Sequence, residues 1–259
     1  MNIGIFDSGI GGMTLLHQAM ITLPKENFIF YADTDHVPYG TKTKEQVIGF
    51  VDEVMQFMIA HDCKAVVIAC NTATSVAAET MREKYEIPII GIEPAVKPAV
   101  EQSAGKRVMV VATPLTIQED KLKNLVEKVD DEHLVDLLAL PKLVSFAEYG
   151  EFNTPKVEAY LREMLAPFCM EEYGELVLGC THFNYFKDSF RKLLPSHVRM
   201  IDGSAGTVNQ LKRILESRGQ LEENEGSVRY FSSGREWTKE QDLKRIEMLH
   251  KRLEYMRSV

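Results

Sequence analysis

The stretches VVIACNTATS (residues 66–75) and LVLGCTHFN (residues 176–184) share one arrangement of residues. In each, an apolar run typical of a buried strand ends at a cysteine, and a polar segment follows. We therefore expect Cys70 and Cys180 at the carboxyl ends of two strands, the edge at which open α/β sheets bind ligands. Backbone amides at the start of the following helices would favour an anion there, whether a thiolate or a substrate carboxylate.

Short apolar runs alternate with longer amphipathic segments along the whole chain. Strands are predicted at residues 3–6, 28–32, 65–69, 87–92, 108–112, 134–140, 175–179, 198–202 and 227–234. Helices are predicted at residues 44–61, 73–84, 118–128, 154–172 and 205–218, with a charged terminal helix from about Glu236. This alternation predicts an α/β fold of parallel βαβ units with right-handed crossovers.

The pattern repeats itself loosely. Asp7, after an opening strand, precedes Cys70 by 63 positions, and Ala112, after another, precedes Cys180 by 68. The similar spacing predicts two pseudo-symmetric α/β domains with mainly parallel sheets and the active site in the cleft between them. We expect one domain to comprise residues 1–94 and 208–259 and the other residues 95–207, with a boundary near EPAVKPAV (residues 93–100).

Charge and composition exclude several classes of protein. The formal net charge of −8, with no long basic run, argues against a nucleic-acid or anionic-membrane partner. No secretory signal and no apolar run of roughly 18 residues is visible, so a cytoplasmic protein is expected. Four cysteines without a CxxC pair argue against a disulfide scaffold and a structural zinc site. Cys63 and Cys169 are predicted to be structural residues inside strands, among apolar neighbours.

Two further motifs flank the predicted strands. In DSGIGG (residues 7–12) the glycines allow a sharp turn close to a ligand, but the motif is neither a dinucleotide fingerprint nor a phosphate loop. A plain strand-to-helix turn is the alternative. Asp7 at the end of a buried strand is costly unless it is paired, and a substrate ammonium is a fitting partner. In HVPYGTKT (residues 36–43) Tyr39 could cap the core, or the loop could hold a substrate carboxylate.

The paired thiols indicate the chemistry. A single nucleophilic cysteine for acyl transfer would need a histidine base, and only Cys180 has one nearby, His182. Two matched thiols without a metal or cofactor motif suit another task, because modest tuning gives either thiol or thiolate at neutral pH. One can remove a proton from a carbon while the other delivers a proton to the opposite face. That combination is racemisation.

At this point the chain resembles the glutamate racemases of the cofactor-independent aspartate/glutamate racemase family. The resemblance rests on GIFDSGIGGMT, ADTDHVPYGTK, VVIACNTATS, GIEPAVKPA, LVLGCTH and MIDGSAGT, in the family's order. It implies an enzyme without a cofactor or metal that makes D-glutamate for cell-wall peptidoglycan, and a homodimer whose interface is not indicated. By resemblance the acid/base groups are Cys70 for the D-substrate and Cys180 for the L-substrate, assisted by Asp7, His182 and Glu148. The residues matching substrate-binding positions are Asp7, Ser8, Pro38, Tyr39, Gly40, Cys70, Asn71, Thr72, Thr181 and His182.

The chain departs from the family pattern beside Cys180. Phe183, Asn184 and Tyr185 stand where the family usually has Tyr-Pro-Leu, and LPKLVS (residues 140–145) replaces the common Cys-Pro-Leu-Phe-Val-Pro before Glu148. These changes bear on the role of Glu148, on substrate range and on regulation. Three other readings stay open: a racemase of aspartate or a related acid, a lyase with a single working thiol, and a protein that binds acidic ligands without reacting.

Overall fold

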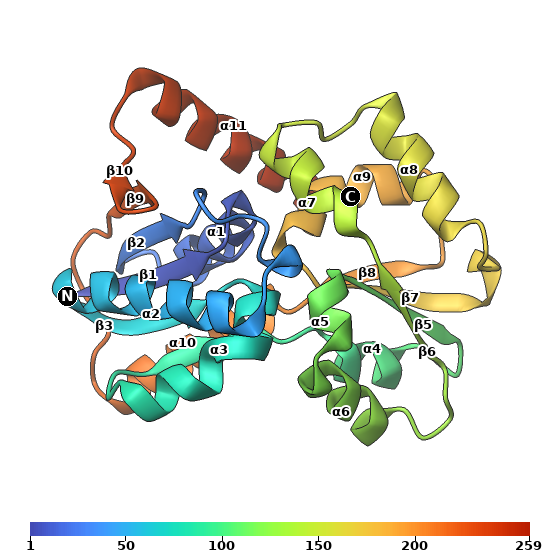
Figure 1. The fold of residues 1–259 in the computed structure, drawn as a ribbon, viewed down its shortest axis with the longest axis horizontal. Coiled ribbons are helices and arrows are strands. Elements are labelled where there is room, and N and C mark those ends of the chain that lie inside the picture. The colour runs from blue at the N-terminus through green and yellow to red at the C-terminus, as the bar shows by residue number, and fades with distance from the viewer.

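The strands form two separate sheets, which lie side by side in the computed structural model of residues 1–259 (Figure 1). The six-stranded sheet has the order β10-β9-β2-β1-β3-β4, and the four-stranded sheet has the order β6-β5-β7-β8. All neighbouring strands are parallel except β9 and β10. The strands are β1 (Asn2–Asp7), β2 (Asn27–Ala32), β3 (Cys63–Ile68), β4 (Ile89–Gly91), β5 (Arg107–Ala112), β6 (Val135–Ala139), β7 (Tyr173–Leu178), β8 (Arg199–Asp202), β9 (Val228–Ser232) and β10 (Arg235–Glu236).

Helices pack against both sheets (Figure 1). The α-helices are α1 (Met13–Thr22), α2 (Lys44–Ala60), α3 (Asn71–Lys84), α4 (Val96–Gln102), α5 (Pro114–Gln118), α6 (Asp120–Val129), α7 (Pro141–Glu148), α8 (Pro155–Leu165), α9 (Lys187–Arg191), α10 (Ser204–Ser217) and α11 (Glu240–Arg257). Four short 3-10 helices are η1 (Ile10–Gly12), η2 (Tyr39–Thr41), η3 (Met170–Glu172) and η4 (Thr181–Phe186). None of the helices combines the length and the apolar character that crossing a membrane requires.

The predicted α/β class and all nine predicted strands are confirmed, because buried runs such as those of β3 and β7 carry apolar residues on both faces. The helix predicted at residues 118–128 is α6, and the short helix α5 precedes it, separated by Glu119. The helix predicted at residues 154–172 was too long, because it ends at Leu165 before a turn and η3. The terminal helix begins at Glu240, after the hairpin strand β10.

The two cysteines expected to be structural differ. Cys63 opens β3, is 5% exposed, and donates its thiol hydrogen to the sulfur of Met58 at 3.8 Å, as expected for a core residue. Cys169 is exposed and precedes η3, so its assignment to a buried strand was wrong. The strand begins only at Tyr173, because the chain first makes a surface turn after α8.

The largest core belongs to both sheets. A single cluster of 44 buried residues joins side chains of β1, such as Ile3 and Ile5, to side chains of β5 and β7, such as Met109 and Leu176. Smaller clusters of 19 and 7 residues lie beyond, the first against the six-stranded sheet and the second against the four-stranded sheet. Burial therefore holds the two sheets together as well as each one internally.

Helix α11 carries a chain of polar contacts across to α1 and β9. The Nδ1 atoms of His17 and His250 lie 3.2 Å apart, and His17 Nε2 lies 2.9 Å from Glu254 Oε2. The hydroxyl of Tyr230 lies 3.0 Å from His250 Nε2. Burial, and then the neighbouring His17, lower the pKa of His250 to about 4.

This network predicts an acid-sensitive fold. The pKa of His250 is about 4 in the folded chain and about 6.5 when unfolded, so between these pH values only the unfolded chain binds the proton. Stability should therefore fall as the pH drops through this window, by about 1 kcal/mol at pH 5 once partial solvent screening is allowed for. Urea unfolding at pH 7 and pH 5 measures it, with His250→Gln as the variant that lacks the titration. An equal loss in wild type and variant would remove His250 as the cause.

Candidate active site

The candidate residues gather where the central strands of the two sheets end. Asp7 ends β1 and Cys70 follows β3, its neighbour in the six-stranded sheet. Thr113 follows β5 and Cys180 follows β7, the two central strands of the other sheet. The carboxyl edges of the two sheets meet here, as hydrogen bonds and close contacts between the two sets of loops demonstrate.

Asp7 is the most buried charge of the site, with no solvent exposure. Its Oδ2 accepts the amide of Gly12 at 2.6 Å, and the Thr181 hydroxyl donates to its two oxygens, each at 3.4 Å. His182 Nδ1 lies 4.0 Å from Oδ2. Burial raises the pKa of Asp7, while the charge of His182 and the Gly12 amide act in the opposite direction. The carboxylate thus joins the loop after β1 to the loop after β7.

Cys70 sits at the N-terminus of α3, as predicted. The amide of Ala73 donates to its sulfur at 3.4 Å, and its thiol donates to the Ser8 hydroxyl at 3.6 Å. Burial, followed by the charge of Asp7, raises the pKa of Cys70. The nearby Cys180 contributes in the same direction, so the two sulfurs lie within electrostatic reach of each other. Cys70 is therefore a protonated thiol at neutral pH in this structure.

Cys180 has a different setting. The segment after it is the 3-10 helix η4, and no amide caps its side chain, so the expected amide cap on this thiol was wrong. Its sulfur instead lies 3.8 Å from His182 Nδ1, and His182 Nε2 lies 2.8 Å from Glu148 Oε1. Burial disfavours the charged ring, but the hydrogen bonds to Cys180 and Glu148 and the charge of Asp7 outweigh it and raise the pKa of His182. A histidine with a raised pKa therefore stands beside the Cys180 sulfur.

The glycines of DSGIGG allow the two halves of the site to touch. A Cβ on Gly9 would meet the Glu148 carboxylate, and a Cβ on Gly11 would meet the His182 ring and the Thr181 hydroxyl. Without side chains, the loop lets the Ile10 amide donate to Glu148 Oε1 at 2.8 Å. The motif is therefore more than a strand-to-helix turn, because its backbone contacts residues that follow β6 and β7.

The loop containing Pro38, Tyr39 and Gly40 lies at the same edge. The Tyr39 hydroxyl is buried and donates to Asp33 Oδ2 at 2.6 Å, and burial and this carboxylate raise the pKa of Tyr39. A Cβ on Gly40 would press on the side chain of Thr113. Tyr39 thus both fills the core and fixes the loop beside the site.

Two threonines that sequence reasoning missed complete the arrangement. The hydroxyls of Thr72, Thr113 and Thr116 lie 2.9 to 3.0 Å from one another, and all three residues are buried. Thr113 directly follows the strand-end Ala112, so its place after a predicted strand was the available signal. The carboxamide oxygen of Asn71 is also buried here and accepts no hydrogen bond.

The site contains no metal-binding cluster of three or more His, Cys, Asp or Glu side chains. It has two thiols with different neighbours, a buried carboxylate, a histidine whose pKa is raised, and several hydroxyls and amides. Such a set can move protons and can hold carboxylate and ammonium groups.

Comparisons with known proteins agree with this geometry. The family model of the Asp/Glu/Hydantoin racemases matches residues 13–211. The chain is 54% identical to a glutamate racemase of Lachnospira eligens over the full length of both, and 52% identical to glutamate racemase 2 of Bacillus subtilis, covering 90% of this chain and 89% of that one.

Solved structures show the same likeness. Glutamate racemase isoform RacE1 of Bacillus anthracis superposes with a TM-score of 0.83 at 30% identity, covering 95% of this chain and 91% of that one. Glutamate racemase of Francisella tularensis, in complex with D-glutamate, superposes with a TM-score of 0.81 at 29% identity, covering 96% and 93%. The chain belongs to the Asp/Glu/hydantoin racemase family.

Proposed function

We propose that the protein interconverts L- and D-glutamate without a cofactor, using Cys70 and Cys180 as the two acid/base groups. The observation that supports this most strongly is that two buried thiols with different neighbours lie at the meeting edges of the two sheets. Cys70 is held as a thiol by burial and Asp7, while Cys180 lies beside a histidine whose pKa is raised. For L-glutamate the proposal gives the role of the acid to Cys70 and the role of the base to Cys180.

The proton transfers balance as follows. For L-glutamate, the Cys180 thiolate takes the α-hydrogen as a proton, and its S–H bond forms while the substrate C–H bond breaks. Cys70 then gives its proton to the opposite face of the carbon, which yields D-glutamate and leaves Cys70 as the thiolate. Starting from D-glutamate, the same steps run in reverse. The thiols return to their first state by proton exchange through water, with Asp7 beside Cys70 and His182 beside Cys180 as the assisting groups.

The remaining groups would hold the substrate. The unpaired carboxamide oxygen of Asn71 suits the substrate ammonium, as does the Asp7 carboxylate. The hydroxyls of Thr72 and Thr181 and the loop of Pro38–Gly40 suit the carboxylates, and Ser8 faces the Cys70 thiol. Because an amino acid's α-hydrogen is a poor acid, these fixed dipoles must stabilise the carbanion in a site without water.

Entry of the substrate requires an opening movement, because Cys70 and Cys180 are each only 6% exposed. In this proposal the domain of residues 1–94 and 208–259 swings against the domain of residues 95–207. The expected boundary after residue 207 falls inside α10, so the hinge is better placed before this helix, at Gly203. A Cβ at Gly203 would collide with the backbone oxygen of Glu93. The two segments that connect the proposed domains, near residues 93 and 203, therefore lie in direct contact.

Glutamate is favoured over aspartate by the names of the relatives that share about half of this sequence. An aspartate racemase of Picrophilus torridus is only 12% identical, with a TM-score of 0.59, and shows the fold alone. A single-thiol lyase and a non-reacting binding protein would not need both thiols. As a supplier of D-glutamate for peptidoglycan, the enzyme would work in the cytoplasm, and a homodimer is expected from the family.

The central prediction concerns turnover. In deuterated water, wild type should convert L-glutamate to the racemate with deuterium at the α-carbon, measured by polarimetry and proton NMR. Cys70→Ala and Cys180→Ala should each lose about 10²–10⁴-fold in rate, since each lacks one acid/base group. Cys63→Ala, a core thiol outside the site, is the control. Faster turnover of L-aspartate than of L-glutamate would show that aspartate is the substrate. Binding of glutamate without exchange of its α-hydrogen would support a non-catalytic binding protein.

A second prediction assigns each thiol to one enantiomer. Cys180→Ala keeps Cys70, so in deuterated water it should slowly exchange the α-hydrogen of D-glutamate without forming L-glutamate. Cys70→Ala should do the same with L-glutamate only. Separate incubations of each enantiomer, followed by mass spectrometry and chiral chromatography, measure this. Exchange of the opposite enantiomer by either variant would reverse the assignment.

A third prediction concerns Glu148. Glu148→Gln removes a carboxylate from His182, so the pKa of His182 should fall and the alkaline limb of the kcat/KM profile should move to lower pH, by about one unit. Glu151→Gln, which changes a more exposed acid three residues on, should leave the profile in place. An unchanged profile in Glu148→Gln would show that the carboxylate does not tune the histidine.

A further inference from the structure

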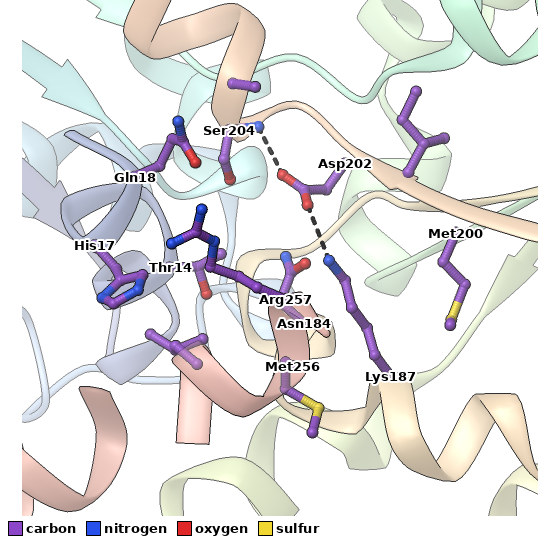
Figure 2. A pocket seen from close by; sticks show the side chains of 13 residues that line it. Thr14, His17, Gln18, Asn184, Lys187, Met200, Asp202, Ser204, Met256 and Arg257 are labelled. Carbon is purple, nitrogen blue, oxygen red and sulfur yellow. Dashed lines mark hydrogen bonds and ion pairs between the residues drawn. The ribbon is translucent and has the colours of Figure 1, made fainter. Parts of the chain in front are cut away.

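A separate cavity of about 260 Å³ lies on the far side of the loop that carries Cys180 and His182. Its walls come from α1, η4, α9, β8, α10 and α11 (Figure 2). The polar side chains around it include Asn184, Lys187, Asp202, Ser204 and Arg257. None of these residues takes part in the proposed proton transfers.

Two polar atoms at this cavity have no partner. The carboxamide oxygen of Asn184 and the hydroxyl of Ser204 make no hydrogen bond, although the residues are only 2% and 5% exposed. A buried polar group without a partner costs about 1–3 kcal/mol, and native structures seldom keep one without a reason. Asn184 is also one of the residues that depart from the family pattern after His182. A ligand bound in this cavity would explain why the chain has asparagine at this position.

Two cations and one acid lie in the cavity wall, so the charges of its lining residues sum to +1. Lys187 and Arg257 extend toward it, as Figure 2 shows, and Ser204 opens the 14-residue helix α10. The first turn of α10, where helix amides favour an anion, lies in the cavity wall at Ser204 and Ala205, and Asp202 accepts the first of these amides. Arg257 Nη1 lies 3.2 Å from Glu254 Oε2, outside the cavity wall. The one acid, Asp202, is already engaged, because its Oδ1 accepts the Ser204 amide at 2.7 Å and its Oδ2 lies 3.5 Å from Lys187 Nζ.

We infer that this cavity binds a small oxyanion, a carboxylate or a phosphate, that also carries one N–H or O–H donor. The anionic oxygens face Lys187, Arg257 and the Ser204 hydroxyl, and the donor pairs with the carboxamide oxygen of Asn184. The volume lies below the roughly 300–1,000 Å³ typical of drug-sized ligand sites, so the occupant is the size of an amino acid or of phosphate itself.

The cavity touches the candidate active site through one carbonyl group. The Thr14 hydroxyl donates to the backbone oxygen of Thr181 at 3.3 Å, and the carboxamide nitrogen of Asn184 lies 3.5 Å from the same oxygen. Thr181 stands between Cys180 and His182 and holds Asp7 through its side chain. An occupant that pulls Asn184 toward itself therefore acts on Thr181, which makes the site a means of adjusting turnover. This second step rests on the proposed racemase function.

Methionine methyl groups report on binding directly. Met200 and Met256 line the cavity, whereas Met55 and Met58 lie in another core cluster. The full-length chain with ¹³C-methyl methionine is titrated with inorganic phosphate and, separately, with L-serine, at constant ionic strength, with resonances assigned by Met→Leu substitutions. The Met200 and Met256 signals should shift and saturate at millimolar probe or below, while those of Met55 and Met58 stay in place. Saturation by one probe only identifies the oxyanion as phosphate or carboxylate.

Variants separate this site from unspecific binding. Ser204→Ala and Lys187→Gln should weaken the binding at least fivefold, and Lys212→Gln, on the exposed side of α10, should not. Unshifted Met55 and Met58 signals show that each variant is folded. No saturable shift with either probe, or shifts that persist unchanged in Lys187→Gln, would overturn the inference.

The coupling to turnover is tested apart from binding. The initial rate of glutamate racemisation should change at least twofold on saturation with the probe that binds, and this change should be absent in Ser204→Ala. A saturable methyl shift with an unchanged rate would support the binding site but refute its coupling to turnover. Because the methyl signals need no turnover, the site can stand or fall independently of the racemase proposal.

Discussion

The arrangement depends on one carboxylate that has lost all contact with water. Asp7 is fully buried, and an isolated buried charge costs several kcal/mol unless hydrogen bonds and an opposite charge replace its hydration. Gly12 on its own loop supplies one bond, but Thr181 and His182 belong to the loop after β7. The carboxylate is therefore satisfied only when the carboxyl edges of the two sheets are together. The same contact that stabilises it also assembles the site.

The loop after β1 can approach the loops after β6 and β7 only where its residues are glycines. Gly9 and Gly11 lie against Glu148, Thr181 and His182, so the loop presents amides where a Cβ would collide. Hydroxyls make the second contact between the halves, at Thr72, Thr113 and Thr116. Both contacts are polar and small, unlike the 44-residue apolar cluster beneath them. In the proposed opening about Gly203, these polar contacts would be the first to separate, because they lie at the meeting edges of the two sheets.

Sequence patterns predicted the strands well, because a strand buried on both faces leaves a continuous apolar run, as in β3 and β7. They also placed Asp7, Cys70 and Cys180 at one edge, because strand order matters little when every carboxyl end points the same way. Thr113 and Thr116 were missed because threonine is common after any strand, and only their distance to Thr72 distinguishes them. Cys169 was misplaced because its apolar neighbours, Phe168 and Met170, lie with it in a surface turn rather than in a buried strand. The neighbours of each thiol come from residues distant in the sequence, such as Ser8 beside Cys70, so no local sequence pattern predicts them.

In the proposed racemisation, thermodynamics requires the forward and reverse reactions to be equally efficient, although the two thiols have different neighbours. Enantiomers have equal free energies in water, so the equilibrium constant of racemisation is one and kcat/KM must be the same in both directions. The site itself is asymmetric: Cys70 has Asp7, Ser8 and a helix N-terminus, whereas Cys180 has His182 and Glu148. These statements agree if the asymmetry acts on bound states rather than on the shared transition state. In the proposed mechanism, an environment that holds Cys70 protonated favours binding of L-glutamate to the resting enzyme, so kcat and KM differ between the enantiomers while kcat/KM does not. Unequal partners are then the expected consequence of building one symmetric reaction from two different loops.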